Sequence, residues 1–378
     1  MSNSQCNPLN SSRFILGRNL RKRDVSGNKI ILIEYKITSL SEEDKPKFEK
    51  VLDEINKNTC FYFNENPNLD GKGKNEVFKG KLFKIKEVEF CNCPEGVHQQ
   101  AVFEFYNKYY TDIIYQDIGR TIGLPFEHTR IDRNKFIHVM EKNIEIQEDD
   151  FKSNCSMDEI INVSYDFGSV MHYSSKKYGH NNKDVIIPTK DYKYYKDTMG
   201  QKSGFSFSDY KKINELHCKN FCKKENTCDY GGYLNPNECN KCLCPYPYDP
   251  NENCKQFIGK LKKCSKIYTL TEEEKTETVP SEESNNFDCF YEFKTDKNHL
   301  IKISINQLSD YKDYQNDICP VGRAVEIRYR KDLSVTGAMF CKQSTEKIIS
   351  QGNEVLIHYF RQNHKKDDLQ IKVERVEK

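Results

Sequence analysis

Apolar residues recur along the chain with the periods of a strand and of a helix. Residues 30–37 form an isoleucine-rich run that predicts a first strand. The next apolar residues, Phe48, Val51, Leu52 and Ile55, have the i, i+3, i+4, i+7 spacing of an amphipathic helix. This helix is expected to end near Asn58. Residues 257–378 alternate as a β-rich segment does.

Length and charge limit the kinds of partner. The 378 residues are enough for two or three domains. Fifty-nine Lys and Arg against 57 Asp and Glu give a formal charge of +2, so nothing favours nucleic acid or an anionic membrane surface as a partner. No apolar run approaches the length of a membrane span, and residues 1–20 lack the apolar segment of a signal peptide.

Sixteen cysteines indicate an oxidising compartment, and we expect a secreted, extracellular protein. Their clustering between Cys218 and Cys254 is typical of a small disulfide module, with a zinc knuckle as the alternative. Because the expected export signal is not visible, we expect the given chain to begin downstream of it. Residues 1–23 read as a propeptide remnant or tail, and the basic run Arg21–Arg23 is either a processing site or a solvated turn.

The most specific motif is Glu-His-Thr-Arg-Ile-Asp-Arg at residues 127–133. A second is Tyr-Asp-Phe-Gly-Ser-Val-Met-His-Tyr at residues 165–173. Together they resemble the turn after the active-site helix and the Met-turn of astacin-family zinc endopeptidases. The resemblance covers nearly the whole chain after Asp24 and is weak between residues 71 and 108. The alternative is a helix in an unrelated fold.

In that family three histidines bind zinc and a glutamate is the general base. The resemblance puts Gln116, Arg120 and Phe126 at the ligand positions and Asp117 at the base position. Phenylalanine has no lone pair, arginine does not deprotonate, and a glutamine amide replaces imidazole poorly. Gly123 lets the chain leave the helix so that residue 126 returns to the same point. The resemblance therefore predicts a degenerate site, no bound metal and no other cofactor, although active relatives hold zinc.

The resemblance gives roles to further residues. Tyr173 holds the oxyanion-stabilising position, and both Tyr173 and Asp117 are expected to be non-functional without zinc. Met171 is expected to be a core residue, and Glu127 matches the residue that holds the mature N-terminus in a salt link. We expect the Arg120 guanidinium to replace the lost metal charge and to pair with Asp117. The alternative is that Arg120 points to solvent.

The resemblance also implies an α+β fold class in three parts. Residues 24–218 would form a metzincin-like, two-lobed astacin peptidase domain, residues 219–255 an EGF-like module, and residues 256–378 an all-β CUB-like sandwich. The implied disulfides are Cys60–Cys218, Cys222–Cys239, Cys228–Cys242, Cys244–Cys254, Cys264–Cys289 and Cys319–Cys341. Four cysteines remain without an implied partner, and their pairing stays open: Cys6, Cys91, Cys93 and Cys155.

Three functions follow from these observations. The favoured one is a secreted, catalytically inactive astacin homologue that binds extracellular proteins or peptides. The alternative is an active zinc metalloendopeptidase whose metal ligands lie elsewhere in the chain. A third is a structural protein whose last two modules mediate adhesion, in which case binding would be confined to residues 219–378.

Overall fold

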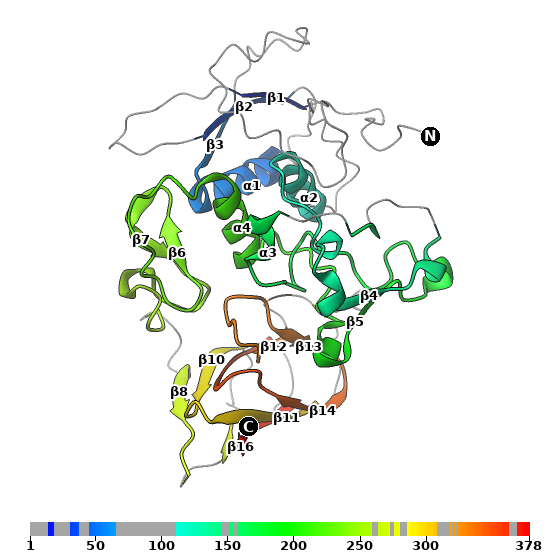
Figure 1. Cartoon of the computed structure of the whole chain (residues 1–378), viewed down its shortest axis with the longest axis vertical. Helices are drawn as coiled ribbons and strands as arrows, with labels where there is room; N and C mark the ends of the chain where they lie inside the picture. The colour runs from blue at the N-terminus through cyan, green and yellow to red at the C-terminus, as the bar shows by residue number, and fades with distance from the viewer. Residues whose placement is uncertain are drawn as a thin grey trace.

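A computed structural model shows an N-terminal sheet, a middle region and a C-terminal sandwich along the long axis (Figure 1). A small unit around β6 (Tyr233–Asn235) and β7 (Glu238–Leu243) lies beside the middle region. It describes residues 14–18, 31–37, 45–65, 111–145, 151–153, 157–258, 264–272, 276–279, 286–307, 318–319, 321, 324–362 and 369–378. The predicted α+β class is confirmed, with helices and short sheets before residue 219 and strands after residue 264.

The N-terminal part is a three-stranded sheet beside one helix. Strands β1 (Phe14–Arg18) and β2 (Ile31–Ile37) are antiparallel, and β3 (Phe61–Glu65) runs parallel to β2. Helix α1 (Lys45–Asn58) connects β2 to β3 and buries the four apolar residues that predicted it. The sequence did not predict β1, which lies in residues 1–23, the expected tail. Backbone hydrogen bonds to β2 place this strand, and such bonds do not require a periodic pattern of apolar residues.

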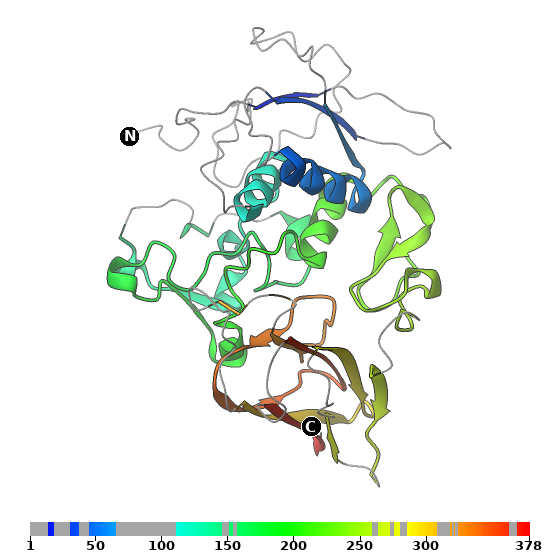
Figure 2. The same cartoon turned by 180° about the vertical axis from the view of Figure 1, so that it is seen from behind.

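The region around the candidate site contains three helices and a short two-stranded antiparallel sheet (Figure 2). The helices are α2 (Thr111–Thr121), α3 (Asp158–Ile161) and α4 (Phe207–His217), and β4 (Ile137–Val139) pairs with β5 (Ile186–Pro188). Short 3₁₀ segments span Glu127–Thr129, Arg133–Lys135, Glu141–Asn143, His180–Asn182 and Lys190–Tyr195. A capping box between Ser206 and Asp209 starts α4, because each side chain accepts a hydrogen bond from the other residue's backbone N–H.

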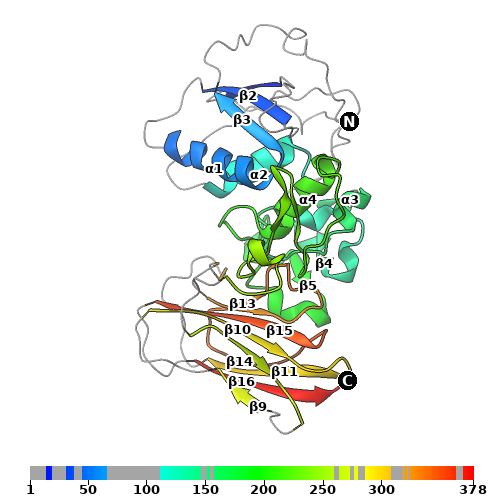
Figure 3. The same cartoon turned by 90° about the vertical axis from the view of Figure 1, so that its left-hand side faces the viewer.

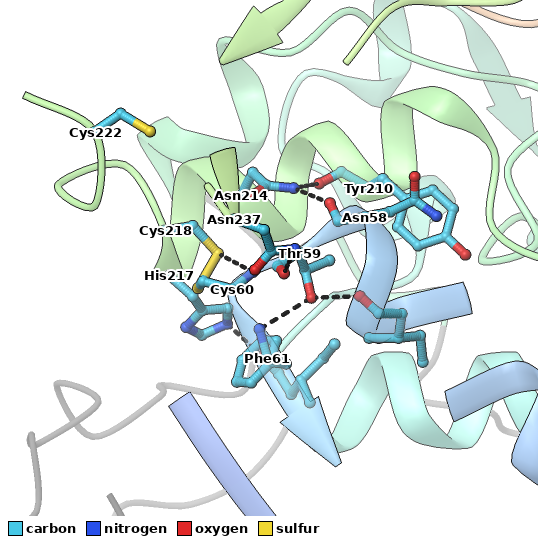
Figure 4. The surroundings of a disulfide bond; sticks show 12 residues. Asn58, Thr59, Cys60, Phe61, Tyr210, Asn214, His217, Cys218, Cys222 and Asn237 are labelled. Atoms are coloured by element: carbon cyan, nitrogen blue, oxygen red, sulfur yellow. Dashed lines mark hydrogen bonds between the residues drawn. A yellow bond between two sulfur atoms is a disulfide. The ribbon is translucent and has the colours of Figure 1, made fainter. Parts of the chain in front are cut away.

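The Cys60–Cys218 disulfide joins the start of β3 to the end of α4 (Figure 4). Asn214 reinforces this junction, since its amide donates to the Asn58 carbonyl at 2.8 Å. Asn237, from the next part of the chain, donates to the Thr59 carbonyl at 2.9 Å. Three segments distant in sequence are therefore fixed at one point.

Residues 219–258 form a small disulfide-rich unit. It contains the hairpin β6 (Tyr233–Asn235) and β7 (Glu238–Leu243) and a 3₁₀ turn at Pro250–Glu252. Its three disulfides are the expected ones: Cys222–Cys239, Cys228–Cys242 and Cys244–Cys254. Because these sulfurs are bonded to each other, they leave no thiolates for the alternative zinc knuckle.

The C-terminal part is a sandwich of two sheets (Figure 3). One sheet has the order β13-β12-β15-β10-β8 and the other β14-β11-β16-β9. The strands are β8 (Lys266–Thr269), β9 (Thr276–Thr278), β10 (Asn286–Lys294), β11 (His299–Gln307), β12 (Val325–Arg328), β13 (Ala338–Phe340), β14 (Ser344–Ile349), β15 (Glu354–Gln362) and β16 (Leu369–Glu377). Disulfides Cys264–Cys289 and Cys319–Cys341 lie in this part. Cys6, Cys91, Cys93 and Cys155 lie outside the described residues.

The sandwich packs directly on the part that contains the candidate site. Arg330 donates to the Tyr165 carbonyl, and the Thr336 hydroxyl donates to the Asp166 carboxylate at 3.2 Å. Gly168 leaves room for this contact, because a Cβ there would lie 2.3 Å from the Thr336 side chain. One apolar cluster extends from α1 into the sandwich. Among the described residues, no helix is long and apolar enough to cross a membrane.

Candidate functional site

Helix α2 carries three of the four residues at the expected ligand and base positions. Gly119 allows this helix to lie close to the Met-turn, since a Cβ there would meet the Met171 sulfur at 3.0 Å. Met171 is fully buried, which agrees with its expected place in the core. Gly123 has φ +88°, and this left-handed conformation turns the chain out of the helix. The helix therefore ends where the motif requires it to end.

Gln116 is held by a backbone partner. Its amide nitrogen donates to the Val170 carbonyl at 2.6 Å, across from α2 to the Met-turn. A histidine bound to a metal would direct a ring lone pair at the ion, whereas this amide presents N–H to a carbonyl oxygen. Gln116 thus links helix α2 to the Met-turn.

Phe126 fills its position with an aromatic ring. Its centroid lies 4.8 Å from the Tyr173 ring and 5.4 Å from the His128 ring. The Arg120 guanidinium lies 5.1 Å from the same centroid, so residues 120 and 126 do converge as the motif implies. The convergence produces a cation–π contact between these two side chains.

Asp117 does not form a salt bridge with Arg120, contrary to our expectation. The guanidinium is half-buried against Phe126, and it acts on the carboxylate as a nearby charge. Burial raises the pKa of Asp117 from 3.8 to about 6, and the attraction of Arg120 opposes that rise. The base position therefore holds a carboxyl that is costly to ionise.

The Met-turn holds its histidine neutral. The His172 Nδ1–H donates to the Tyr173 carbonyl at 2.7 Å, and Nε2 accepts from the Tyr165 hydroxyl at 2.8 Å. Complete burial lowers the pKa of His172 to about 4. Tyr173 is itself buried, with its ring 4.3 Å from the His128 ring. Both side chains serve the packing of the turn.

Glu127 is the centre of a buried charge network. Lys212 of α4 donates to its Oε2, and Arg130 donates to its Oε1 at 3.0 Å. The backbone N–H of Asp166 donates to Oε1 at 2.8 Å. These cations hold the pKa of Glu127 below its usual range although burial alone would raise it. The resemblance implied a salt link between Glu127 and the mature N-terminus. In the structure, the Lys212 and Arg130 side chains are the cations that pair with this carboxylate.

Sequence reasoning missed Lys212 and Arg130 as partners of Glu127. Lys212 is 85 positions away, and no spacing rule connects the two. Arg130 belongs to the motif and also holds Asp132 with two hydrogen bonds of 2.9 Å. Only the packing of α4 against the turn brings these charges together.

The residues at the expected metal positions do not fit a zinc ion. Among them only Gln116 offers a neutral oxygen, a poor substitute for imidazole, and its amide nitrogen is bonded to the Val170 carbonyl. Within the described ranges, one group of His, Cys, Asp or Glu side chains is close enough to share an ion, namely Cys228, Cys242 and Cys254. All three belong to disulfides. The described donor set therefore gives no support to zinc coordination.

Comparison with known proteins identifies two family matches. The model for the astacin peptidase family matches residues 27–218, and that for the CUB domain matches residues 264–369. The zinc metalloproteinase nas-36 of Brugia malayi is 32% identical over 238 residues, or 61% of this chain and 40% of that protein. The zinc metalloproteinase dpy-31 of Caenorhabditis elegans is 25% identical over 344 residues, or 88% of this chain and 56% of that protein.

A solved structure is also similar in part. The hatching-enzyme zinc protease high choriolytic enzyme 1 of the medaka Oryzias latipes matches with a TM-score of 0.38 and 21% identity, covering 52% of this chain and 93% of that one. The chain spans about half or less of the curated relatives named above. Since the astacin match alone covers more than half of its residues, the chain belongs to the astacin family of peptidases.

Proposed function

We propose that this astacin-family protein is secreted, has no zinc-dependent peptidase activity, and acts as a binding module for extracellular proteins or peptides. The observation that carries the proposal is the chemistry at residues 116, 120 and 126. In place of three imidazoles there are an amide hydrogen-bonded to the Met-turn, a guanidinium, and a phenyl ring packed against Tyr173.

Loss of these ligands removes the chemistry that the family uses. Zinc lowers the pKa of its bound water to near neutrality and polarises the carbonyl under attack. Without it, Asp117 has only ordinary water to activate, and its own raised pKa leaves it partly protonated near pH 6. Tyr173 is packed among aromatic rings instead of standing beside a metal.

The surrounding fold supports retention as a binding scaffold. The Met-turn and Glu127 network stay fully buried and hydrogen-bonded, and the C-terminal sandwich docks on them through Arg330 and Thr336. A rigid base of this kind is what exposed binding loops need. The sequence cues for an EGF-like module and for secretion agree with an extracellular partner.

Metal content and cleavage together test this proposal. The purified, oxidised protein should hold no stoichiometric zinc by mass spectrometry and should cleave no peptide in a complex peptide mixture, with or without a chelator. About one zinc per chain with chelator-sensitive cleavage would overturn the proposal and would favour an active metalloendopeptidase whose ligands are other residues.

A gain-of-ligand variant is the matched control. The combined substitutions Gln116→His, Asp117→Glu, Arg120→His and Phe126→His restore the family's residue types at the four positions. Zinc uptake by this variant, with none by the parent, would verify that these positions are the lost site. If both proteins take up zinc equally, the assignment of these positions is wrong.

A further inference from the structure

We infer that Arg120 and Lys177 form a binding site for an acidic peptide segment, with carboxylate side chains as the groups that they recognise. The inference rests on the proposed function, because it names the ligand class of the same site. It starts from two cations that are fixed by aromatic rings and that, among the described residues, form no salt bridge with a carboxylate.

The charge of Arg120 acts on the nearby Asp117 carboxylate without a salt bridge between them. Its side chain is half-buried, and among the described residues its guanidinium contacts the Phe126 ring, 5.1 Å from the centroid, and forms no salt bridge. A guanidinium has five N–H donors. An aromatic face attracts its charge but does not accept these N–H groups in the way that carboxylate oxygens do. The contact therefore fixes the position of the cation but leaves its fork of donors for a ligand.

Lys177 presents a second cation in the same manner. Its side chain is exposed, and Nζ lies 4.4 Å from the Tyr178 centroid and 5.7 Å from the Tyr173 centroid. The Tyr173 ring is in turn 4.8 Å from the Phe126 ring beneath Arg120. The two cations are thus connected through a continuous row of aromatic rings.

The aromatic rings between the two cations are themselves tightly packed. Phe126 and Tyr173 are both more than nine-tenths buried, and the Phe151 ring packs against Tyr173 with centroids 5.7 Å apart. Packed aromatic side chains sample few alternative rotamers. A ligand therefore meets a half-buried guanidinium that rests on a buried ring, which lowers the entropic cost of binding at Arg120.

The geometry favours separate carboxylates over one compact dianion. Arg120 and Lys177 belong to different segments, α2 and the chain after the Met-turn, so they suit two anionic groups spaced along an extended peptide. A guanidinium fork pairs with a planar carboxylate through two parallel hydrogen bonds. Asp117, which interacts electrostatically with Arg120, would repel a doubly charged phosphate more strongly than a carboxylate.

Fluorescence anisotropy with two matched probes tests the inference. The first probe is a fluorescein-labelled decapeptide with four Asp and Glu residues, and the second has Asn and Gln at the same positions. The full-length protein should bind the acidic probe at least about 10-fold more tightly at low salt, and this preference should fall as salt rises.

The variants assign the binding to the two cations. Arg120→Gln should weaken the acidic probe about 10-fold, and Lys177→Gln about 3-fold because its charge is exposed. Arg120→Lys should recover only part of the loss, since lysine keeps the charge but not the fork. Lys297→Gln removes an exposed lysine from the turn between β10 and β11 and should leave binding unchanged.

The outcomes separate this inference from the proposed function. Acidic-probe binding that both Arg120→Gln and Lys177→Gln leave intact, in variants with unchanged melting temperatures, would overturn the site. Equal affinity for the two probes would overturn the ligand class. Neither result bears on zinc content or cleavage, which decide the proposed function by themselves.

Discussion

Replacing Lys212 by Met is the most direct probe of the buried charge network around Glu127. Both side chains are about 1% exposed, so neither charge can be solvated when its partner is removed. Breaking such a pair by deleting one partner typically costs about 3–5 kcal/mol. Glu127 keeps Arg130 and the Asp166 N–H on Oε1, whereas Oε2 loses its cation. We therefore expect a loss near the lower limit, about 3 kcal/mol.

The measurement is urea unfolding with all disulfides intact. Because the chain contains no tryptophan and 23 tyrosines, tyrosine fluorescence and far-UV circular dichroism are the suitable signals. The double variant Lys212→Met with Glu127→Gln leaves no buried charge unpaired at this contact. It should be more stable than Lys212→Met alone and give a coupling energy of about 2 kcal/mol.

Lys219→Met is the matched control for this variant. Lys219 pairs with Glu215 at 3.6 Å on the surface, where a salt bridge contributes about 0–1 kcal/mol. A loss below about 1 kcal/mol for Lys212→Met, similar to this control, would refute the argument that α4 supplies the cation for Glu127.

The remaining predictions concern pH and the docking of the sandwich. Burial raises the pKa of Asp117 above its unfolded value, so its native-state ionisation costs stability as pH rises from 3.8 through about 6. Asp117→Asn should therefore gain up to about 3 kcal/mol over the parent at pH 7 and nothing below pH 4, and a constant difference across urea titrations would contradict this. Burial lowers the pKa of His172, so its contribution to the free energy of unfolding is complete above pH 6.5 and is lost as pH falls to about 4. His172→Gln should remove up to about 3 kcal/mol of acid sensitivity from the unfolding profile, and an unchanged profile would exclude this role. Gly168→Ala should cost about 1–3 kcal/mol by pushing its Cβ into Thr336, with rescue by Thr336→Gly; a melting temperature equal to the parent's would show that this contact is loose.

Local pattern and motif were sufficient for much of the fold. The apolar spacing of α1 specified which face is buried, because helical periodicity needs no knowledge of distant residues. The resemblance to astacins gave the family and, with it, bridges such as Cys60–Cys218. The residue types at 116, 120 and 126 were enough to predict that the zinc chemistry is missing.

Tertiary structure alone decided what those residues do instead. The hydrogen bond from Gln116 to the Val170 carbonyl, the Lys212 contact with Glu127, and the packing of Thr336 on the turn at residues 166–168 join segments between 54 and 170 positions apart. Local propensity acts over a few residues, whereas these partners are chosen by how helices and sheets pack and by the need to pair every buried charge. The sequence by itself therefore determined which residue types stand at the family's ligand positions, and the packing determined which partners hold those side chains.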